Sequence, residues 1–189
     1  MRRNAITLLF TLVFLPATAL TAAGDQPEGQ QSYESCGLIT GEYLTVLQLI
    51  SRGYTPESLK QALPDISEKA QGRVDMLVTM SRRDGIIDSY STINAEYAVC
   101  AKKVFDARGL PPKATREAHF HQCAGENKVG YEIAIAALIG APEADVVKQL
   151  DSRHKAKAES IFQDLESAGT LAMFDSLSTE LKRCLAALP

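Results

Sequence analysis

Residues 36–57 read CGLITGEYLTVLQLISRGYTPE, and residues 123–143 read CAGENKVGYEIAIAALIGAPE. Both stretches begin with a cysteine, carry a tyrosine beside an apolar run, and end in a glycine followed closely by Pro-Glu. The cysteine and the glycine are 17 positions apart in each stretch. A glycine after such a run is typical of a helix C-terminus, and Pro-Glu is typical of the first turn of the next helix. The same pair of helices is therefore predicted twice in this chain.

A second pattern surrounds the other two cysteines. Apolar residues stand at the same three offsets from Cys100 and from Cys184, with spacings that place each set on one helical face. The two sets are Ile93, Tyr97 and Val104, and Leu177, Leu181 and Leu188. We therefore predict an all-α fold of two tandem disulfide-stapled repeats, each of about four helices, over 32–110 and 113–189. Each repeat is expected to close a small core of its own.

Residues that can cap helices, and glycines and prolines that end them, predict the helix boundaries. In the first half, helices are expected from Ser32 or Ser35 to Gly53, and over 55–63, 67–83 and 92–108. Residues 86–90 have mild strand character and are expected to form an extended connector. In the second half, helices are expected over 115–139, 142–150, 153–168 and 171–187, the last two separated near Gly169.

The first 23 residues are expected to be a cleavable signal peptide. Arg2 and Arg3 form a positive n-region, residues 5–15 form an apolar h-region, and small residues follow Pro16. The apolar segment is shorter than the roughly 20 residues of a membrane span. Residues 24–31 are polar and are expected to form a flexible mature N-terminus. We therefore predict a periplasmic or secreted protein with no transmembrane segment after cleavage.

The four cysteines, placed behind an export signal, indicate disulfide bonds in an oxidising compartment. The repeat favours one bond in each half, Cys36 with Cys100 and Cys123 with Cys184. A second arrangement stays open at this point. An antiparallel helix pair joined at 109–114 would bring Cys100 level with Cys123.

The charge and the motifs of the chain argue against several classes of function. The chain carries 20 Lys and Arg against 23 Asp and Glu, a net charge of −3, and neither half forms a basic patch. Nucleic-acid binding needs clustered basic side chains to replace phosphate counterions, so no nucleic-acid partner is expected. The sequence has no G-x-S-x-G elbow, glycine-rich phosphate loop or C-x-x-C-H haem site. We expect neither a catalytic site nor a cofactor.

His119 and His121 are the candidate metal ligands. On a helix, His119 lies one turn before Cys123 and Glu117 lies one turn before His121, so each pair could present two ligands to one ion. Because the repeat already assigns Cys123 to a disulfide, a polar first turn of a helix is the simpler interpretation. Metal or small-ligand binding through His119 and His121 is kept as the alternative function.

Tyr43 and Tyr131 stand at matched places beside the apolar runs, each next to a glutamate, Glu42 or Glu132. These four residues are the candidates for lining a binding groove between helices. The competing interpretation is that the tyrosines belong to the core, with one hydroxyl in water, and that the glutamates lie on solvated helix faces.

In its Cys…Tyr…Gly…Pro-Glu pattern and its later cysteine-bearing helix, each half resembles small exported helical proteins of proteobacteria. These have one disulfide per repeat and are largely uncharacterised, and the resemblance covers about residues 32–188. It implies an all-α, disulfide-stapled periplasmic fold and carries over no catalytic residue. The chain is also similar, more loosely, to the periplasmic acid-stress chaperones. We therefore expect a non-enzymatic periplasmic protein that binds another protein or a peptide, with stress or acid chaperone activity as one form.

Overall fold

The computed structural model describes residues 31–62 and 67–187, and every secondary-structure element in these ranges is an α-helix. The first half contains α1 (Tyr33–Ser51), α2 (Pro56–Ala62), α3 (Glu68–Asp84) and α4 (Ile86–Arg108). The second half contains α5 (Arg116–Leu138), α6 (Glu143–Gln149) and α7 (Ser152–Ala186). The all-α fold class predicted from the sequence is confirmed.

Side-chain caps lie at the starts of four of these helices, and at α2 the Thr55 hydroxyl accepts a hydrogen bond from the Ser58 amide at 3.2 Å. Ser32 and Ser35 form a capping box at α1, in which each hydroxyl accepts a hydrogen bond from the other residue's amide, at 3.0 and 2.9 Å. Ser67 and Thr115 accept in the same way from amides in the first turns of α3 and α5. Such caps satisfy amides that have no partner within the helix. The polar residues expected to start these helices therefore do so.

The stretch from Ile86 to Tyr90 is helical, which corrects the expectation of an extended connector. Gly85, with a φ of 89°, ends α3, and α4 begins at the next residue. Tyr90 and Ile93 are buried on the same side of α4 as Tyr97. Burial of this helical face outweighs the strand propensity of the isoleucines, because propensity is a weak preference that packing overrides.

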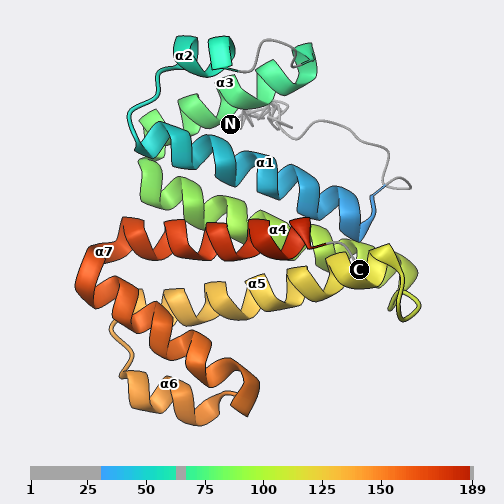
Figure 1. Cartoon of the computed structure of the whole chain (residues 1–189), viewed down its shortest axis with the longest axis vertical. Helices are drawn as coiled ribbons and strands as arrows, with labels where there is room; N and C mark the ends of the chain where they lie inside the picture. Colours follow the sequence, from blue (N-terminus) through green and yellow to red (C-terminus); the bar gives the residue numbers. More distant parts are fainter. Residues whose placement is uncertain (1–30, 63–66, 188–189) are drawn as a thin grey trace, which may run out of the picture.

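The helix α7 is bent back on itself at one residue. Gly169 has φ 84° and ψ 177°, so α7 consists of two arms, residues 152–168 and residues 170–186. This positive φ costs glycine little because it has no Cβ. The expected separation near Gly169 is confirmed. In Figure 1 the first arm lies beside α6, and the second arm returns alongside α5.

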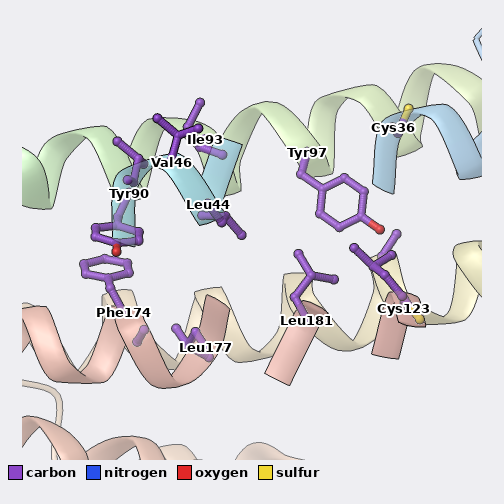
Figure 2. Packing of buried hydrophobic residues seen from close by; sticks show 14 of the residues in the cluster. Cys36, Leu44, Val46, Tyr90, Ile93, Tyr97, Cys123, Phe174, Leu177 and Leu181 are labelled. Carbon is purple, nitrogen blue, oxygen red and sulfur yellow. The ribbon is translucent and has the colours of Figure 1, made fainter. Parts of the chain in front are cut away.

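The two halves pack into one body with a shared hydrophobic core. Figure 1 shows α1, α4, α5 and the second arm of α7 side by side, with α2 and α3 at one end and α6 at the other. One cluster of buried side chains includes Tyr33 of α1, Phe120 of α5 and Leu185 of α7. Within it, Tyr90 of α4 faces Phe174 of α7 (Figure 2). The expectation of a separate core in each half is therefore wrong, because the apolar faces of each half are covered by the other.

Two disulfide bonds join the helices in pairs. Cys36 of α1 is bonded to Cys100 of α4, and Cys123 of α5 is bonded to Cys184 of α7. This confirms the pairing that the repeat favoured, and the alternative bond between Cys100 and Cys123 is not formed. The tandem repeat, with boundaries at 32–110 and 113–189, stays a prediction.

The expected signal peptide (1–23) and nearly all of the expected flexible stretch (24–31) lie outside the described residues. Between residues 31 and 187, leaving out 63–66, no helix has both the length and the apolar character that crossing a membrane requires.

Candidate functional site

A groove of about 550 Å³ opens between α1, α3 and the end of α7. Its lining is mostly apolar and comes from both halves of the chain. The lining residues are Leu38, Gly41, Glu42, Thr45, Val46 and Leu49 of α1, Ala70 and Val74 of α3, and Lys182, Leu185 and Ala186 of α7. Sites that bind ligands commonly have volumes of about 300–1,000 Å³, apolar walls and a few placed polar groups. The groove matches these sites in its volume, its apolar walls and its small number of polar side chains.

The apolar surface of the groove combines buried and exposed side chains. Val46 and Leu185 belong to the core, whereas Leu38 is 50% exposed and extends the apolar lining to the solvent. Gly41 lies beside α7, because a Cβ at this position would be 3.2 Å from Leu185 Cδ1. Because Gly41 has no side chain, α1 projects less into the groove at this position.

Glu42 lines the groove and is held by an arginine of the neighbouring helix. The Arg73 guanidinium on α3 donates to both Glu42 carboxylate oxygens, with Nη2 at 2.8 and 2.7 Å. The hydrogen bond to Glu42 raises the pKa of Arg73, and burial opposes this rise. A bidentate pair of this kind fixes geometry as well as charge. The pair therefore ties α1 to α3 at the groove.

Lys182 is the cationic residue of the groove lining. Its Nζ donates to the side-chain oxygen of Gln48, and the Gln48 amide donates to the backbone oxygen of Asp175 at 3.2 Å. Burial lowers the pKa of Lys182, the charge of Arg52 lowers it further, and Asp175 opposes both. Among the described residues, no carboxylate lies within 4.0 Å of Lys182 Nζ. An anionic group of a ligand could therefore pair directly with the Lys182 ammonium.

The other three residues predicted to line a groove lie elsewhere. Tyr43 is partly buried against the core and does not line the groove. The Tyr131 hydroxyl is 2.7 Å from Ser91 Oγ, which gives it a local partner. Glu132 is 58% exposed and pairs with Lys128 one turn earlier on α5, at 2.5 Å. Of the four candidates, only Glu42 is in the groove.

Sequence reasoning missed Leu38, Arg73 and Lys182. One signal for Leu38 was available, since this apolar residue stands outside the face of α1 that carries Cys36. The other two had none, because the contact of Arg73 with Glu42 and the burial of Lys182 both depend on how distant segments pack.

The structure does not bring His119 and His121 together as a pair of ligands. Nε2 of His119 is 2.7 Å from the backbone oxygen of Cys184, whereas the ring of His121 meets the Tyr33 ring edge-on, with centroids 4.8 Å apart. His119, Cys123 and Cys184 form a group whose potential ligand atoms all lie within 4.8 Å of one another. In the oxidised protein both cysteines of this group are bonded to each other.

A second pocket, of about 700 Å³ and more polar, lies between the two arms of α7. Lys157 on the first arm is 3.1 Å from Glu126 of α5 and 2.7 Å from Glu180 of the second arm. His154 is buried, and its Nδ1, which makes no hydrogen bond, is 3.6 Å from the Glu126 carboxylate. The Lys157 ammonium contacts both carboxylates and connects α5 to both arms, so we interpret this cluster as structural.

Comparisons of the chain with protein-family models, with curated proteins and with solved structures found no match.

Proposed function

We propose that this chain is a non-enzymatic exported protein that binds a peptide segment of another protein in the groove between α1, α3 and α7. The observation that carries the proposal is the apolar lining, which continues from the core to the half-exposed Leu38. Amphipathic helices bind other proteins by laying their apolar face into grooves of this kind. The groove therefore suits an apolar helical segment of a partner.

The charge in the groove favours an acidic residue on that segment. Lys182 lines the groove and has no carboxylate within ion-pair distance among the described residues, so an acidic side chain of the ligand would compensate it. The carboxylate of Glu42 is already satisfied by Arg73. Complementary charge adds register and specificity more than affinity.

The arrangement of polar groups supports binding rather than catalysis. Acid–base chemistry needs a titratable group within hydrogen-bond reach of a reacting atom. The two charged residues of the lining, Glu42 and Lys182, hydrogen-bond to Arg73 and Gln48. Both side chains are thus engaged in hydrogen bonds within the described part of the chain.

The two disulfide bonds support an exported location, since such bonds persist in oxidising compartments. Together with the predicted signal peptide, they favour the periplasm as the place where the groove meets its partner.

Fluorescence anisotropy with a panel of labelled amphipathic helical peptides tests the proposal. We expect at least one peptide to bind the wild-type protein, and Leu38→Glu to weaken its binding at least about ten-fold by placing a charge against its apolar face. Val99→Glu is the matched control, because Val99 is 55% exposed on α4 and lies outside the groove. Absence of binding by every peptide, or equal loss in both variants, would contradict the proposal.

The acidic-residue preference is tested in the same assay. Lys182→Gln is expected to remove the advantage of a peptide carrying a glutamate over the same peptide carrying a glutamine. An advantage that survives the substitution would mean that Lys182 does not contact the ligand.

A chaperone-like form of this function predicts that the protein suppresses aggregation of an unfolding client in acid. In acid, protonation of the 23 Asp and Glu side chains would leave the chain strongly positive, and repulsion between its positive charges would loosen the packing around the groove. Light scattering of an aggregating client at neutral and acidic pH measures the effect. Absence of protection at every pH would rule this form out and leave peptide binding to the anisotropy experiment.

A further inference from the structure

One side-chain cluster has the composition of a soft-metal site but is held in an oxidised state. His119 and Cys123 stand one turn apart on α5, and Cys184 comes from the second arm of α7. Nε2 of His119 is 3.6 Å from the sulfur of Cys123, which is bonded to the sulfur of Cys184. All three potential ligand atoms lie within 4.8 Å of one another. The disulfide at Cys36 and Cys100 belongs to no such group among the described residues.

One of the three distances in this cluster, that between His119 and Cys123, is already close to what a tetrahedral zinc ion requires, and the other two would have to adjust. With Zn–N of about 2.0 Å and Zn–S of about 2.3 Å, a nitrogen and a sulfur bound to one zinc are about 3.5 Å apart. The separation of 3.6 Å between His119 and Cys123 already has this value. The two sulfurs would have to separate to about 3.8 Å, which breaking their bond allows. Cys123 is buried, while His119 and Cys184 are partly exposed, so an ion could enter from their side.

We propose that reduction of the Cys123–Cys184 disulfide creates a zinc-type site whose ligands are His119 Nε2 and the two cysteine sulfurs. This inference does not depend on the proposed peptide groove. Thiolate and imidazole ligands select zinc and similar ions over magnesium or calcium. Three protein ligands leave the fourth tetrahedral position to water.

The reduction of the Cys123–Cys184 disulfide requires a reductant, for which a dithiol is sufficient. The dithiol supplies two electrons and two protons, becomes a disulfide itself, and converts Cys123 and Cys184 to thiols. Binding of the ion then displaces both thiol protons, because the thiolate is the metal ligand. Nε2 of His119 binds through its lone pair, so the ring proton resides on Nδ1 and the contact with the Cys184 carbonyl is given up.

The metal ion and the disulfide would both cross-link α5 to α7. Each joins α5 to α7 at the same place, one through a covalent bond and the other through the ion. Because the ion binds the folded state and the unfolded chain offers no preformed site, zinc is expected to stabilise the reduced protein.

The test uses the full chain, reduced under anaerobic conditions, with zinc as the probe. Cysteines are alkylated with iodoacetamide with and without one equivalent of zinc, and the products are mapped by mass spectrometry. We expect zinc to slow alkylation of Cys123 and Cys184 by at least about ten-fold and to leave Cys36 and Cys100 unchanged. Titration with Co²⁺ is expected to produce the visible absorption of a tetrahedral thiolate site at one ion per chain.

Two matched variants identify the nitrogen ligand. His119→Gln keeps a donor for the Cys184 carbonyl but is expected to lose at least about ten-fold in affinity for Co²⁺, as removal of even an outer-shell partner costs 10–100-fold. His121→Gln, on the same helix, is expected to bind like the wild type. Protection spread over all four cysteines, equal affinity in His119→Gln, or no zinc-dependent protection would each overturn the proposal.

Discussion

The rings of Tyr90 and Phe174 lie almost parallel, with an interplanar angle of 6° and centroids 5.7 Å apart. Tyr90 comes from α4 and Phe174 from the second arm of α7, and both are fully buried (Figure 2). The Tyr90 hydroxyl donates to Asp175 Oδ1 at 2.6 Å, so the buried polar atom has a partner. This pair joins the two halves within the shared core.

Phe174→Ala is expected to lower the free energy of unfolding by about 3–5 kcal/mol, because it leaves a cavity in a tightly packed core. Phe174→Leu, which refills part of the space, should cost less. Urea unfolding followed by far-UV circular dichroism measures both. If Phe174→Ala lowers the free energy of unfolding by less than about 1 kcal/mol, the surrounding side chains must move in to fill the cavity.

Removing either disulfide should destabilise the whole chain rather than one half. The two bonds close separations of 64 and 61 residues, and loops of this size are worth about 4 kcal/mol in the chain-entropy model. Serine replacement of one cysteine pair at a time is expected to leave one cooperative unfolding transition, because the core is shared. Two separate transitions in either variant would indicate halves that unfold independently.

Glu117 of α5 caps the first turn of α1. Its carboxylate oxygens accept from the Tyr33 amide at 2.9 Å and from the Glu34 amide at 3.3 Å. Glu117→Ala is expected to cost about 1 kcal/mol, the usual price of a lost N-terminal cap. The amides of Tyr33 and Glu34 should exchange with deuterium faster in this variant. Glu132→Ala, at an exposed position, is the control and should change stability by less than about 0.5 kcal/mol. Unchanged exchange at both amides would contradict the capping role.

The ion pair of Glu34 with Arg116 gives stability a defined pH dependence. The hydrogen bond from Arg116 lowers the pKa of Glu34, burial opposes it, and the charge of Arg116 adds to the lowering. The stabilisation from this ion pair is therefore fully present above the unfolded-state pKa of Glu34 and is lost as pH falls through its lower folded-state pKa. The Tm of Glu34→Gln should lie below that of the wild type at neutral pH, and the two should converge in acid. A difference in Tm that persists at the acid end would exclude this pair as its cause.

Two helical glycines should respond to alanine with opposite signs. At Gly37 a Cβ would lie 2.8 Å from Leu185 Cδ2 and 2.9 Å from Phe120 Cδ1, so Gly37→Ala is expected to cost about 1–3 kcal/mol. At Gly72 nothing lies within 4 Å, and Gly72→Ala should stabilise by roughly 0.5–1 kcal/mol through helix propensity. Thermal unfolding of both variants is the measurement. Stabilisation by Gly37→Ala would mean that helix propensity outweighs packing at this position, and destabilisation by Gly72→Ala would contradict the propensity argument.

The part of the candidate site that the sequence predicted is limited to Glu42. This glutamate was singled out by its place beside a tyrosine in a repeated motif, a local signal. The groove around it was not predictable, because its walls are made by α1, α3 and α7, and no local pattern states which helices will be neighbours. His119 was a candidate ligand, but its position beside the bond between Cys123 and Cys184 is likewise a matter of packing.

The sequence by itself determined the class of structure and most helix boundaries, because capping side chains and chain-breaking glycines act within a few residues. Ser32 and Gly169 illustrate this, one beginning a helix and the other bending one. The sequence also favoured one disulfide in each half, without excluding a bond between Cys100 and Cys123. Only the tertiary structure decided that Ile86 to Tyr90 is helical, that both halves share one core, and that the groove exists. These depend on burial against segments far away in the chain, and that energy outweighs local preference wherever the two disagree.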